Sequence, residues 1–310
     1  MAEQDLIAFI RSQASGALPG WLRVGIGDDA TVLGPLGEQP VVLTTDMLVE
    51  GTHFQPGTPL EAVGYKAIAR CLSDLAAMAA RPLCTLAAVT FGADRSTASA
   101  RVLVRSMWVS AEKLGARLVG GDVSTSTGPL TICITALGVV GARGAVLRSG
   151  AQAGNAVCVT GSLGGSMRGR HLTFTPRMAE ALELVDRCEV HAMIDISDGL
   201  STDALHIAAE SNVGLALEAA AIPLSDDALV MGRQEGTPDA ALRHALNDGE
   251  DYELLFCVGQ QDARSLAATG VAGARVSIIG SVEPGPHSAL IRPDGTREPL
   301  RSGGWEHPTG

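Results

Sequence analysis

Aromatic residues and lysines are both scarce in this sequence. Phe, Trp and Tyr make up 3% of the 310 residues, and Lys66 and Lys113 are the only lysines. Any core must therefore be built mainly from Ala, Val, Leu and Ile, which the hydrophobic content of 46% can supply. The formal net charge is -11 and no Lys/Arg block offsets it, so we expect neither a nucleic-acid partner nor binding to an anionic membrane.

The cysteines form no C-x-x-C pair, and no histidine spacing accompanies them that would indicate zinc. Most lie inside apolar runs, which favours buried free thiols in a reducing cytosol over a disulfide framework. The N-terminus has acids where a signal peptide has basic residues, and the apolar stretch near residues 130–142 is too short to span a bilayer. We therefore expect a cytoplasmic protein.

The length suggests two domains of about 150 residues each. Apolar, β-rich segments bounded by Gly, Pro or Asp predict strands: 30–33, 41–49, 83–91, 130–140, 156–160, 192–196, 253–258 and 276–279. Amphipathic or Ala/Leu-rich spacing predicts helices: 2–14, 59–80, 96–114 and 198–212. The tail from residue 293 is polar and is expected to be loop. The sequence thus predicts an α/β (α+β) protein with domains at 1–145 and 146–310.

Aspartates recur in five short segments beside apolar stretches. An ionised carboxylate in such a place is costly unless it is hydrogen-bonded, paired or bound to a cation. Each segment has a simpler explanation: a turn at Asp28 and Asp29, a strand end at Asp46, an ion pair of Asp74 with Arg70, and helix N-caps at Asp122 and Asp198. Together, drawn from both halves and accompanied by threonine hydroxyls, they favour Mg²⁺.

Magnesium held by carboxylates is the usual way to present a nucleoside triphosphate, so phosphoryl transfer is the favoured chemistry. No G-x-x-x-x-G-K-[ST] motif occurs, and the protein-kinase motif set is absent. The glycine-rich segment Gly161–Ser166 follows a predicted strand. Its backbone N–H groups can face an anion, although a tight strand-to-helix turn explains the same text.

Six segments span most of residues 24–258: GIGDDATVL, TTDMLVEGTHF, GYKAIARCLSDLAAM, GGDVS, IDISDGLSTDALHIA and GEDYELLF. In this order they resemble the thiamine-monophosphate kinase family, within the superfamily of ATP-using enzymes typified by aminoimidazole ribonucleotide synthetase. The second, third and last segments are specific to the kinase. GDD and SDGL alone indicate only the superfamily.

The resemblance implies an N-terminal domain that forms a homodimer through its sheet, with ATP between the two domains. It implies ATP-dependent phosphorylation of thiamine monophosphate to the diphosphate by direct in-line transfer with several Mg²⁺ ions. The implied magnesium ligands are Asp29, Thr44, Thr45, Asp46, Asp74, Asp122, Asp195 and Asp198. Of these, Asp46, Asp122 and Asp198 are the implied catalytic residues. The implied nucleotide contacts are Gly121, Asp122, Arg148 and Ser197. The implied substrate contacts are His53, Glu250 and Trp305.

The substrate contacts also have simpler explanations. His53 suits a hydrogen bond at an element end, Glu250 follows strong turn text, and Trp305 suits an apolar plug for the tail. The sequence departs from the family at Asp248-Gly249, where the family usually has Gly-Gly, at Val123-Ser124, and in a shorter stretch between Gly169 and His171. The alternatives are another enzyme of the superfamily, such as an aminoimidazole ribonucleotide synthetase-like one, or a non-catalytic Mg²⁺-nucleotide-binding module.

Overall fold

The chain forms two compact units in a computed structural model that describes residues 20–24, 32–33, 37, 39–92 and 96–305. The first unit contains residues 1–75 and 80–144, and the second contains residues 76–79 and 145–310. The predicted helix at 2–14 lies outside the described residues, as does part of the predicted strand at 30–33. Among the helices that the structure describes, none combines the length and apolar character needed to cross a bilayer.

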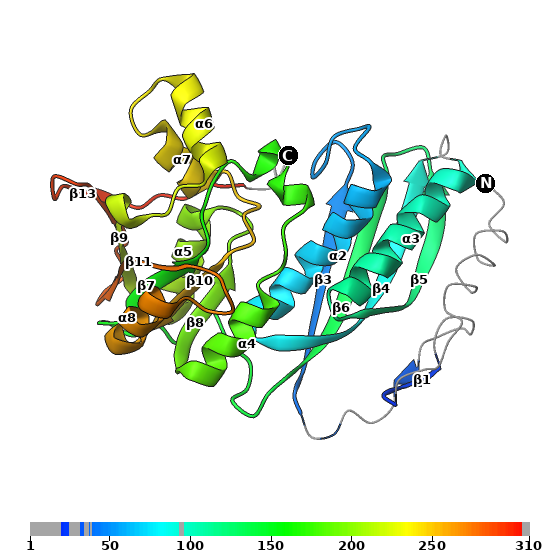
Figure 1. Cartoon of the computed structure of the whole chain (residues 1–310), viewed down its shortest axis with the longest axis horizontal. Helices are drawn as coiled ribbons and strands as arrows, with labels where there is room; N and C mark the ends of the chain where they lie inside the picture. Colours follow the sequence, from blue (N-terminus) through cyan, green and yellow to red (C-terminus); the bar gives the residue numbers. More distant parts are fainter. Residues whose placement is uncertain (1–19, 25–31, 34–36, 38, 93–95, 306–310) are drawn as a thin grey trace. The chain divides into compact units, whose positions relative to one another are not determined.

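The first unit is built on a four-stranded sheet with the strand order β3-β6-β4-β5. Its strands are β3 (Val41–Val49), β4 (Ala80–Gly92), β5 (Arg117–Ser126) and β6 (Thr131–Val140). Only β4 and β5 run parallel. Two helices, α2 (Leu60–Ala77) and α3 (Thr97–Lys113), lie over one face of the sheet (Figure 1). A separate pair of short strands, β1 (Leu22–Val24) and β2 (Val32–Leu33), is antiparallel.

Side chains of β3 alternate between the two faces of this sheet, as its period of two requires. Val42 and Leu48 are buried beneath the helices. On the other face Leu43 is 67% exposed and Met47 is 52% exposed. One face of the first unit is therefore covered by helices, while the other presents apolar side chains.

The second unit is a seven-stranded sheet with the order β13-β12-β9-β11-β7-β10-β8. These strands are β7 (Ala156–Thr160), β8 (Val190–Asp195), β9 (Gly214–Glu218), β10 (Leu254–Val258), β11 (Val276–Glu283), β12 (Ala289–Ile291) and β13 (Arg297–Pro299). Its helices are α4 (Met178–Arg187), α5 (Leu200–Ser211), α6 (Asp226–Glu235), α7 (Ala240–Asn247) and α8 (Gln260–Thr269). Short 3₁₀ turns η1 (Ser166–Arg168), η2 (Arg170–Leu172) and η3 (Ala219–Ala221) complete it.

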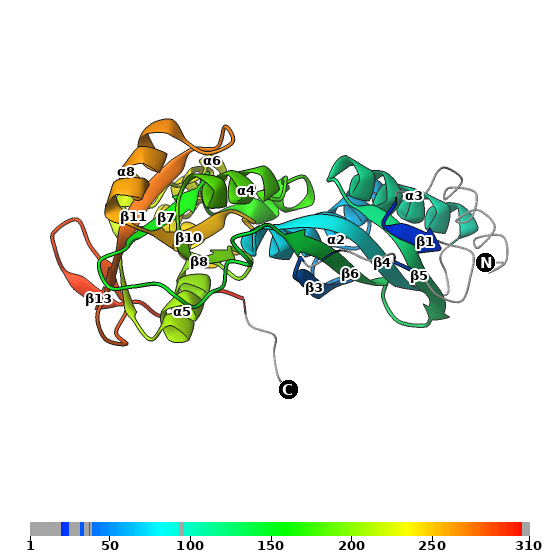
Figure 2. The same cartoon turned by 90° about the horizontal axis from the view of Figure 1, so that it is seen from below.

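Both faces of this second sheet are buried, which explains why β7 and β10 are continuous apolar runs. Val157 and Leu255 pack in one core with α5 and α7, while Cys158 and Phe256 pack in the other with α4 and α8. Figure 2 shows α4 and α8 on one side of the sheet and α5 on the other. All six cysteines are free, and all but Cys133 are buried, as expected.

Several predicted elements differ from the structure at proline or glycine. Helix α2 ends at Ala77, and Pro82 lies inside β4, where the pairing with β6 shifts register between Pro82 and Cys84. A strand tolerates proline at such an irregularity because no ladder hydrogen bond is required there. Strand β5 continues through Gly120 and Gly121 to Ser126, where the sequence suggested a helix N-cap at Asp122, and the tail contains β13 where only loop was expected.

Candidate active site

Two of the predicted acids of the first unit, Asp46 and Asp74, do not lie at element ends. Asp46 lies within β3 and Asp74 lies within α2. The alternation of β3 directs Thr44 and Asp46 to the face covered by α2, where the Thr44 hydroxyl donates to Asp74 Oδ2 at 2.6 Å. Arg70, one helical turn before Asp74, makes an ion pair with Asp46. The sequence suggested an ion pair between Arg70 and Asp74, and the structure shows Arg70 paired with Asp46.

Asp122 lies on the other face of the same sheet. Asp122 pairs with Ala88 of β4, Ala88 pairs with Cys133 of β6, and Cys133 pairs with the exposed Met47 of β3. Paired side chains point to the same face of a sheet, so Asp122 shares a face with Met47. Asp46 pairs instead with the buried Ile134. The prediction of a helix N-cap at Asp122 is wrong, because the residue is inside β5 and exposed. The structure therefore does not bring the Asp46 and Asp122 side chains of one chain together.

Gly121 and Thr45 belong to the same region. A Cβ at Gly121 would approach Ala87 O to 2.0 Å, so only glycine fits beside β4. The hydroxyl of Thr45 lies on the exposed face, 3.2 Å from the Thr135 hydroxyl, and also reaches Ile134 O at 3.2 Å. Asp29, the remaining predicted ligand of this half, lies outside the described residues.

His53 makes the local hydrogen bond that the sequence allowed as its simpler role. Its Nδ1 accepts from the Val49 backbone N–H at 2.9 Å. The fully buried Lys66 donates through Nζ to His53 O at 2.6 Å. Lys66 is not among the residues predicted from the sequence. Its position inside an Ala/Leu-rich predicted helix, in a chain with only two lysines, was a signal that could have identified it.

In the second unit, acids gather at the turn between β8 and α5. Asp195 ends β8 and is 4% exposed, while Asp198 precedes α5, whose N-cap residue is Gly199 rather than Asp198. Asp203, in the first turn of α5, accepts from the N–H groups of Asp198 at 3.1 Å and Gly199 at 3.2 Å. Burial and the charges of Asp195 and Asp198 raise the pKa of Asp203 well above its ordinary value.

Asp198, Asp203 and His206 offer ligand atoms that all lie within 4.8 Å of one another. Asp203 and His206 are not among the predicted site residues, although both stand in the matched text and lie three residues apart on one face of α5. Carboxylate oxygens crowded in this way suit a hard divalent cation, because the cation offsets their mutual repulsion.

Of the proposed nucleotide contacts, Ser197 is half-buried and its carbonyl accepts from Glu250 N at 2.7 Å. Arg148 is exposed.

Glu250 lies in a short segment, Asp248–Glu253, that we call the acidic loop. The backbone of Glu250 adopts a left-handed conformation with φ +53°. Non-glycine residues adopt this conformation rarely, and when they do it is often at functional sites. Its carboxylate lies 3.1 Å from His171 Nδ1, and the Tyr252 hydroxyl donates to it at 3.4 Å.

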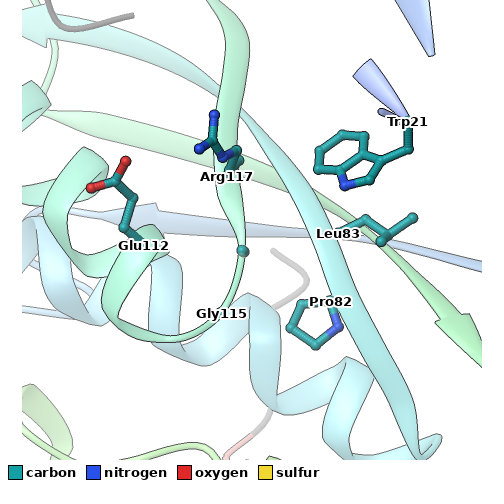
Figure 3. Close-up of a pocket in the computed structure, with 7 residues that line it drawn as sticks. Trp21, Pro82, Leu83, Glu112, Gly115 and Arg117 are labelled. Carbon is teal, nitrogen blue, oxygen red and sulfur yellow. The ribbon is translucent and has the colours of Figure 1, made fainter. Parts of the chain in front are cut away.

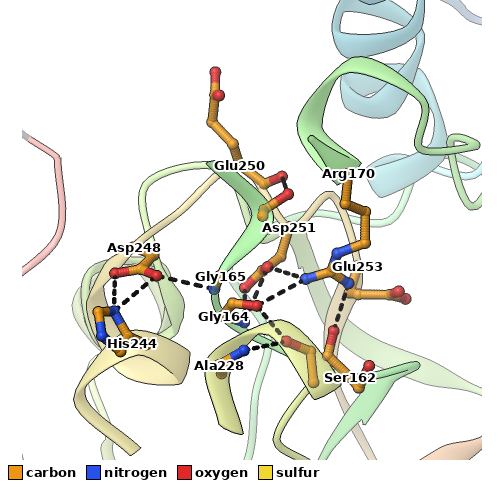
Figure 4. Close-up of polar contacts among 12 residues, drawn as sticks. Ser162, Gly164, Gly165, Arg170, Ala228, His244, Asp248, Glu250, Asp251 and Glu253 are labelled. Carbon is orange, nitrogen blue, oxygen red and sulfur yellow. Dashed lines mark hydrogen bonds and ion pairs between the residues drawn. The ribbon is translucent and has the colours of Figure 1, made fainter. Parts of the chain in front are cut away.

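The other carboxylates of the acidic loop are held by the protein itself (Figure 4). Gly164 N–H donates to both oxygens of Asp251 at 3.0 and 2.9 Å, and Gly165 N–H donates to Asp248 Oδ2 at 2.9 Å. The glycine turn therefore does bind anions, but these are the chain's own side chains. Burial raises the pKa of Asp251 to about 7, even though Arg170 lies 2.5 Å away.

Trp305 does not act as an apolar plug, because 47% of it is exposed. Instead backbone hydrogen bonds hold the tail to residues Asp195–Asp203, the segment from the end of β8 to the first turn of α5 that we call the acid turn. The Trp305 N–H donates to Asp198 O at 3.0 Å, and the Gly304 N–H donates to the Thr202 hydroxyl at 3.2 Å. The backbone of Trp305 is therefore fixed beside Asp198 while about half of the residue faces solvent.

A cavity of about 380 Å³ lies elsewhere in the first unit (Figure 3). Its lining comprises Trp21, Pro82, Leu83, Glu112, Gly115, Ala116 and Arg117. None of the residues that the sequence predicted for the site is among them. The candidate site consequently rests on the acid clusters and not on this cavity.

Comparison with known proteins connects these clusters to one family. Models of the AIR synthase related protein match residues 27–140 with the N-terminal domain and residues 152–292 with the C-terminal domain. Thiamine-monophosphate kinase of Rhodopirellula baltica is 39% identical over 289 residues, which cover 90% of this chain and 89% of that relative.

Two solved structures are also similar. Thiamine-monophosphate kinase from Stenotrophomonas maltophilia K279a superposes with a TM-score of 0.79 at 32% identity, covering 96% of this chain and 98% of that one. AaThiL complexed with AMPPCP and TMP has a TM-score of 0.76 at 28% identity, covering 98% of this chain and 96% of that one. The chain therefore belongs to the thiamine-monophosphate kinase family of phosphotransferases, built from the two AIR synthase related domains.

Proposed function

We propose that this enzyme transfers the terminal phosphoryl group of ATP to thiamine monophosphate by direct in-line displacement, giving thiamine diphosphate and ADP. The observation that carries the proposal is the similarity along nearly the whole chain to a protein solved with AMPPCP and TMP. The carboxylate clusters of both units supply the chemistry that such a reaction requires. A non-catalytic binding module has no comparable support, since the relatives are named as kinases.

The chemistry needs charge cancellation more than a base. The acceptor is a phosphate whose second pKa is about 6, so it is largely ionised at neutral pH and already nucleophilic. When bound, Mg²⁺ ions neutralise the repulsion between the two facing phosphates. The task of the protein is to hold its carboxylates and the reacting groups in fixed positions.

Two groups of oxygen donors fit this task. On the helix-covered face of the first sheet we assign Thr44, Asp46 and Asp74 as magnesium ligands, since hydroxyl and carboxylate oxygens are the donors that this ion prefers. In the second unit we assign Asp195 and Asp198. Asp29, Thr45 and Asp122 complete the proposed set, with Thr45 and Asp122 on the exposed sheet face.

We propose further that the exposed face of the first sheet is the homodimer interface. Val41, Leu43, Met47 and Leu86 are between 40% and 67% exposed on it. Apolar side chains clustered on a flat sheet favour burial against a second copy. Asp122 lies on this face, so dimerisation would place it beside the partner. The remaining proposed contacts are Gly121, Arg148 and Ser197 for the nucleotide, and His53, Glu250 and Trp305 for thiamine monophosphate.

A coupled ADP assay with thiamine monophosphate, ATP and Mg²⁺ tests the function. We expect ADP and thiamine diphosphate in equal amounts, and a loss of about 100-fold or more in kcat for Asp46→Asn, as for other groups that stabilise transferred charge. Asp226→Asn is the matched control, because Asp226 is an exposed acid in the first turn of α6. Wild-type turnover no higher than that of Asp46→Asn would refute the proposal.

A further inference from the structure

Every polar group of Glu250 is held by a neighbour. Its N–H donates to Ser197 O at 2.7 Å, and its carbonyl accepts from the Ser166 hydroxyl at 2.6 Å. One carboxylate oxygen lies 3.1 Å from His171 Nδ1, and the other accepts from the Tyr252 hydroxyl at 3.4 Å. The left-handed backbone and the carboxylate are thus both fixed, which leaves the side chain with one preferred orientation.

Two of the groups that hold Glu250 come from one segment, residues 166–174, which contains η1 and η2 and which we call the bracing segment. Besides Ser166 and His171, it supplies Arg170, whose guanidinium binds Asp251 at 2.5 Å. It also supplies Phe174, whose ring stacks on Tyr252 with centroids 3.9 Å apart and planes inclined by 13°. Figure 4 shows Arg170 directed at the acidic loop.

The two residues that contact the Glu250 carboxylate are themselves immobilised. His171 is 6% exposed and Tyr252 is 3% exposed. Tyr252, like Glu250, has a left-handed backbone, with φ +52°. Two such conformations within three residues persist only when their surroundings hold them, and strain of this kind is commonly found where a ligand is bound. The arrangement therefore resembles a preorganised binding group rather than a loosely placed surface acid.

We propose that His171 and Tyr252 are positioning residues that orient the Glu250 carboxylate toward the positively charged ring of the acceptor substrate. This inference rests on the proposed function, in which Glu250 contacts thiamine monophosphate. The thiazolium ring carries a permanent positive charge, so a fixed carboxylate favours this acceptor over a neutral ring of the same shape. The shortened stretch before His171 then forms part of the substrate site.

Ground-state binding of the acceptor is the step that this orientation affects. A misdirected carboxylate weakens contact with the ring but does not alter the phosphates or the nucleotide. The signature is therefore a higher KM for thiamine monophosphate with little change in kcat or in the KM for ATP. A purely structural brace would instead lower the amount of folded enzyme, which reduces the apparent kcat and leaves the KM values unchanged.

Initial rates of the full-length enzyme test this, with each substrate varied in turn. We expect His171→Leu to raise the KM for thiamine monophosphate about tenfold, as for loss of a hydrogen bond to a charged group. His171→Asn, which keeps an N–H donor, should recover most of that loss. Tyr252→Phe keeps the ring that stacks on Phe174 and should raise the same KM about threefold, since its 3.4 Å contact is the longer one. His287→Leu, at an exposed histidine, is the matched control.

A neutral acceptor sharpens the result. Deazathiamine monophosphate replaces the ring nitrogen by carbon and so lacks the positive charge. Wild-type enzyme should prefer the charged acceptor by kcat/KM, and His171→Leu should lose part of that preference. An unchanged preference, or a KM for ATP that rises as much as that for the acceptor, would overturn the inference.

The positioning role and the proposed function fail in different ways. If wild-type enzyme does not phosphorylate thiamine monophosphate, the function itself is wrong. If wild-type turns over and Glu250→Gln raises the acceptor KM, while His171→Leu and Tyr252→Phe leave it unchanged, only the positioning role is wrong. Should His171→Leu not fold, Tyr252→Phe and His171→Asn still decide between these outcomes.

Discussion

The acidic loop Asp248–Glu253 and the acid turn Asp195–Asp203 both concentrate carboxylates in the second unit, yet their surroundings differ. In the acidic loop, Asp251 receives two backbone contacts and Arg170, while Glu253 receives Arg177 at 2.6 and 2.7 Å. In the acid turn the carboxylates lie near one another, and burial together with the charges of Asp195 and Asp198 raises the pKa of Asp203. In the first cluster Asp251 and Glu253 each have an arginine partner, whereas in the second Asp203 has backbone donors beside neighbouring carboxylates whose repulsion a cation would relieve.

The surroundings of an acid separate structural acids from ligand-binding acids better than the number of acids does. A carboxylate that already has arginine and backbone donors contributes to the fold, and removing a donor leaves it buried and uncompensated. A carboxylate that repels its neighbours lowers stability until a ligand arrives. Glu250 is the exception in the acidic loop, because its partners orient it and its backbone is strained.

The largest expected effect is on the acid turn. We predict that Asp198→Asn lowers kcat by about 100-fold or more, as for loss of a charge-stabilising group. Without Mg²⁺, the same substitution should leave the melting temperature unchanged or raise it, because it removes one repelling charge beside Asp203. Thermal melts with and without Mg²⁺, alongside the coupled assay, measure both. A marked loss of stability without Mg²⁺ would show that Asp198 is a structural acid after all.

The acidic loop should respond in the opposite way. Arg177→Met leaves Glu253, which is 3% exposed, without its arginine, and we expect a loss of about 3–5 kcal/mol in the free energy of unfolding. Urea denaturation measures it. The control is Arg297→Met, whose ion pair with Glu283 is exposed and should cost about 1 kcal/mol or less. Equal losses for the two variants would remove the distinction between buried and exposed pairs.

Asp251 adds a pH dependence. The pKa of Asp251 is about 7 in the folded protein, compared with an ordinary value of 3.8 that applies to the unfolded chain. The folded state therefore holds the proton more tightly than the unfolded state does. Stability should therefore fall as the pH rises from about 4 to about 7, with a slope approaching 1.4 kcal/mol per pH unit from this one group. Asp251→Asn should remove that component from urea denaturation curves measured across the range. An unchanged slope would contradict it.

The smallest effect concerns Asp248, where the family usually has glycine. Its carboxylate accepts from the Gly165 N–H and lies 2.9 Å from His244 Nδ1. Burial lowers the pKa of His244, but hydrogen bonds to Asp248 and Glu235 outweigh it and raise the pKa overall. We expect Asp248→Gly to cost about 1–2 kcal/mol of stability, with the KM for thiamine monophosphate changed less than twofold. A much larger change in KM would place Asp248 in the substrate site.

The sequence predicted the regular strands and helices well where apolar spacing is uninterrupted, as in β3, β7 and α5. It failed where glycine or proline serves a packing role. Gly121 stands in a strand because a side chain would collide with Ala87, and no local pattern distinguishes this from a turn. Polar helices such as α6 were missed because their first-turn acids and few apolar residues look like loop.

For the site, the motifs predicted which residues matter but not how they are arranged. The pairing of Arg170 with Asp251 joins residues 81 positions apart, and spacing along the chain gives no sign of it. The opposite orientation of Asp46 and Asp122 depends on strand register, which only the folded sheet fixes. Asp203 and His206 are different, since both stand in the matched text, and their separation of three residues in a predicted helix places them on one face.

Residues 76–79, at the end of α2, belong to the second unit, although the chain on either side of them belongs to the first. Ala76 and Ala79 are fully packed in the core that also contains Leu184 and Phe256, and Met78 O accepts from Val146 N at 3.2 Å. The second unit is consequently not one continuous stretch of chain. A fragment that starts at residue 145 would expose an unfilled patch of its own core, so dissection of this enzyme calls for substitutions rather than truncation.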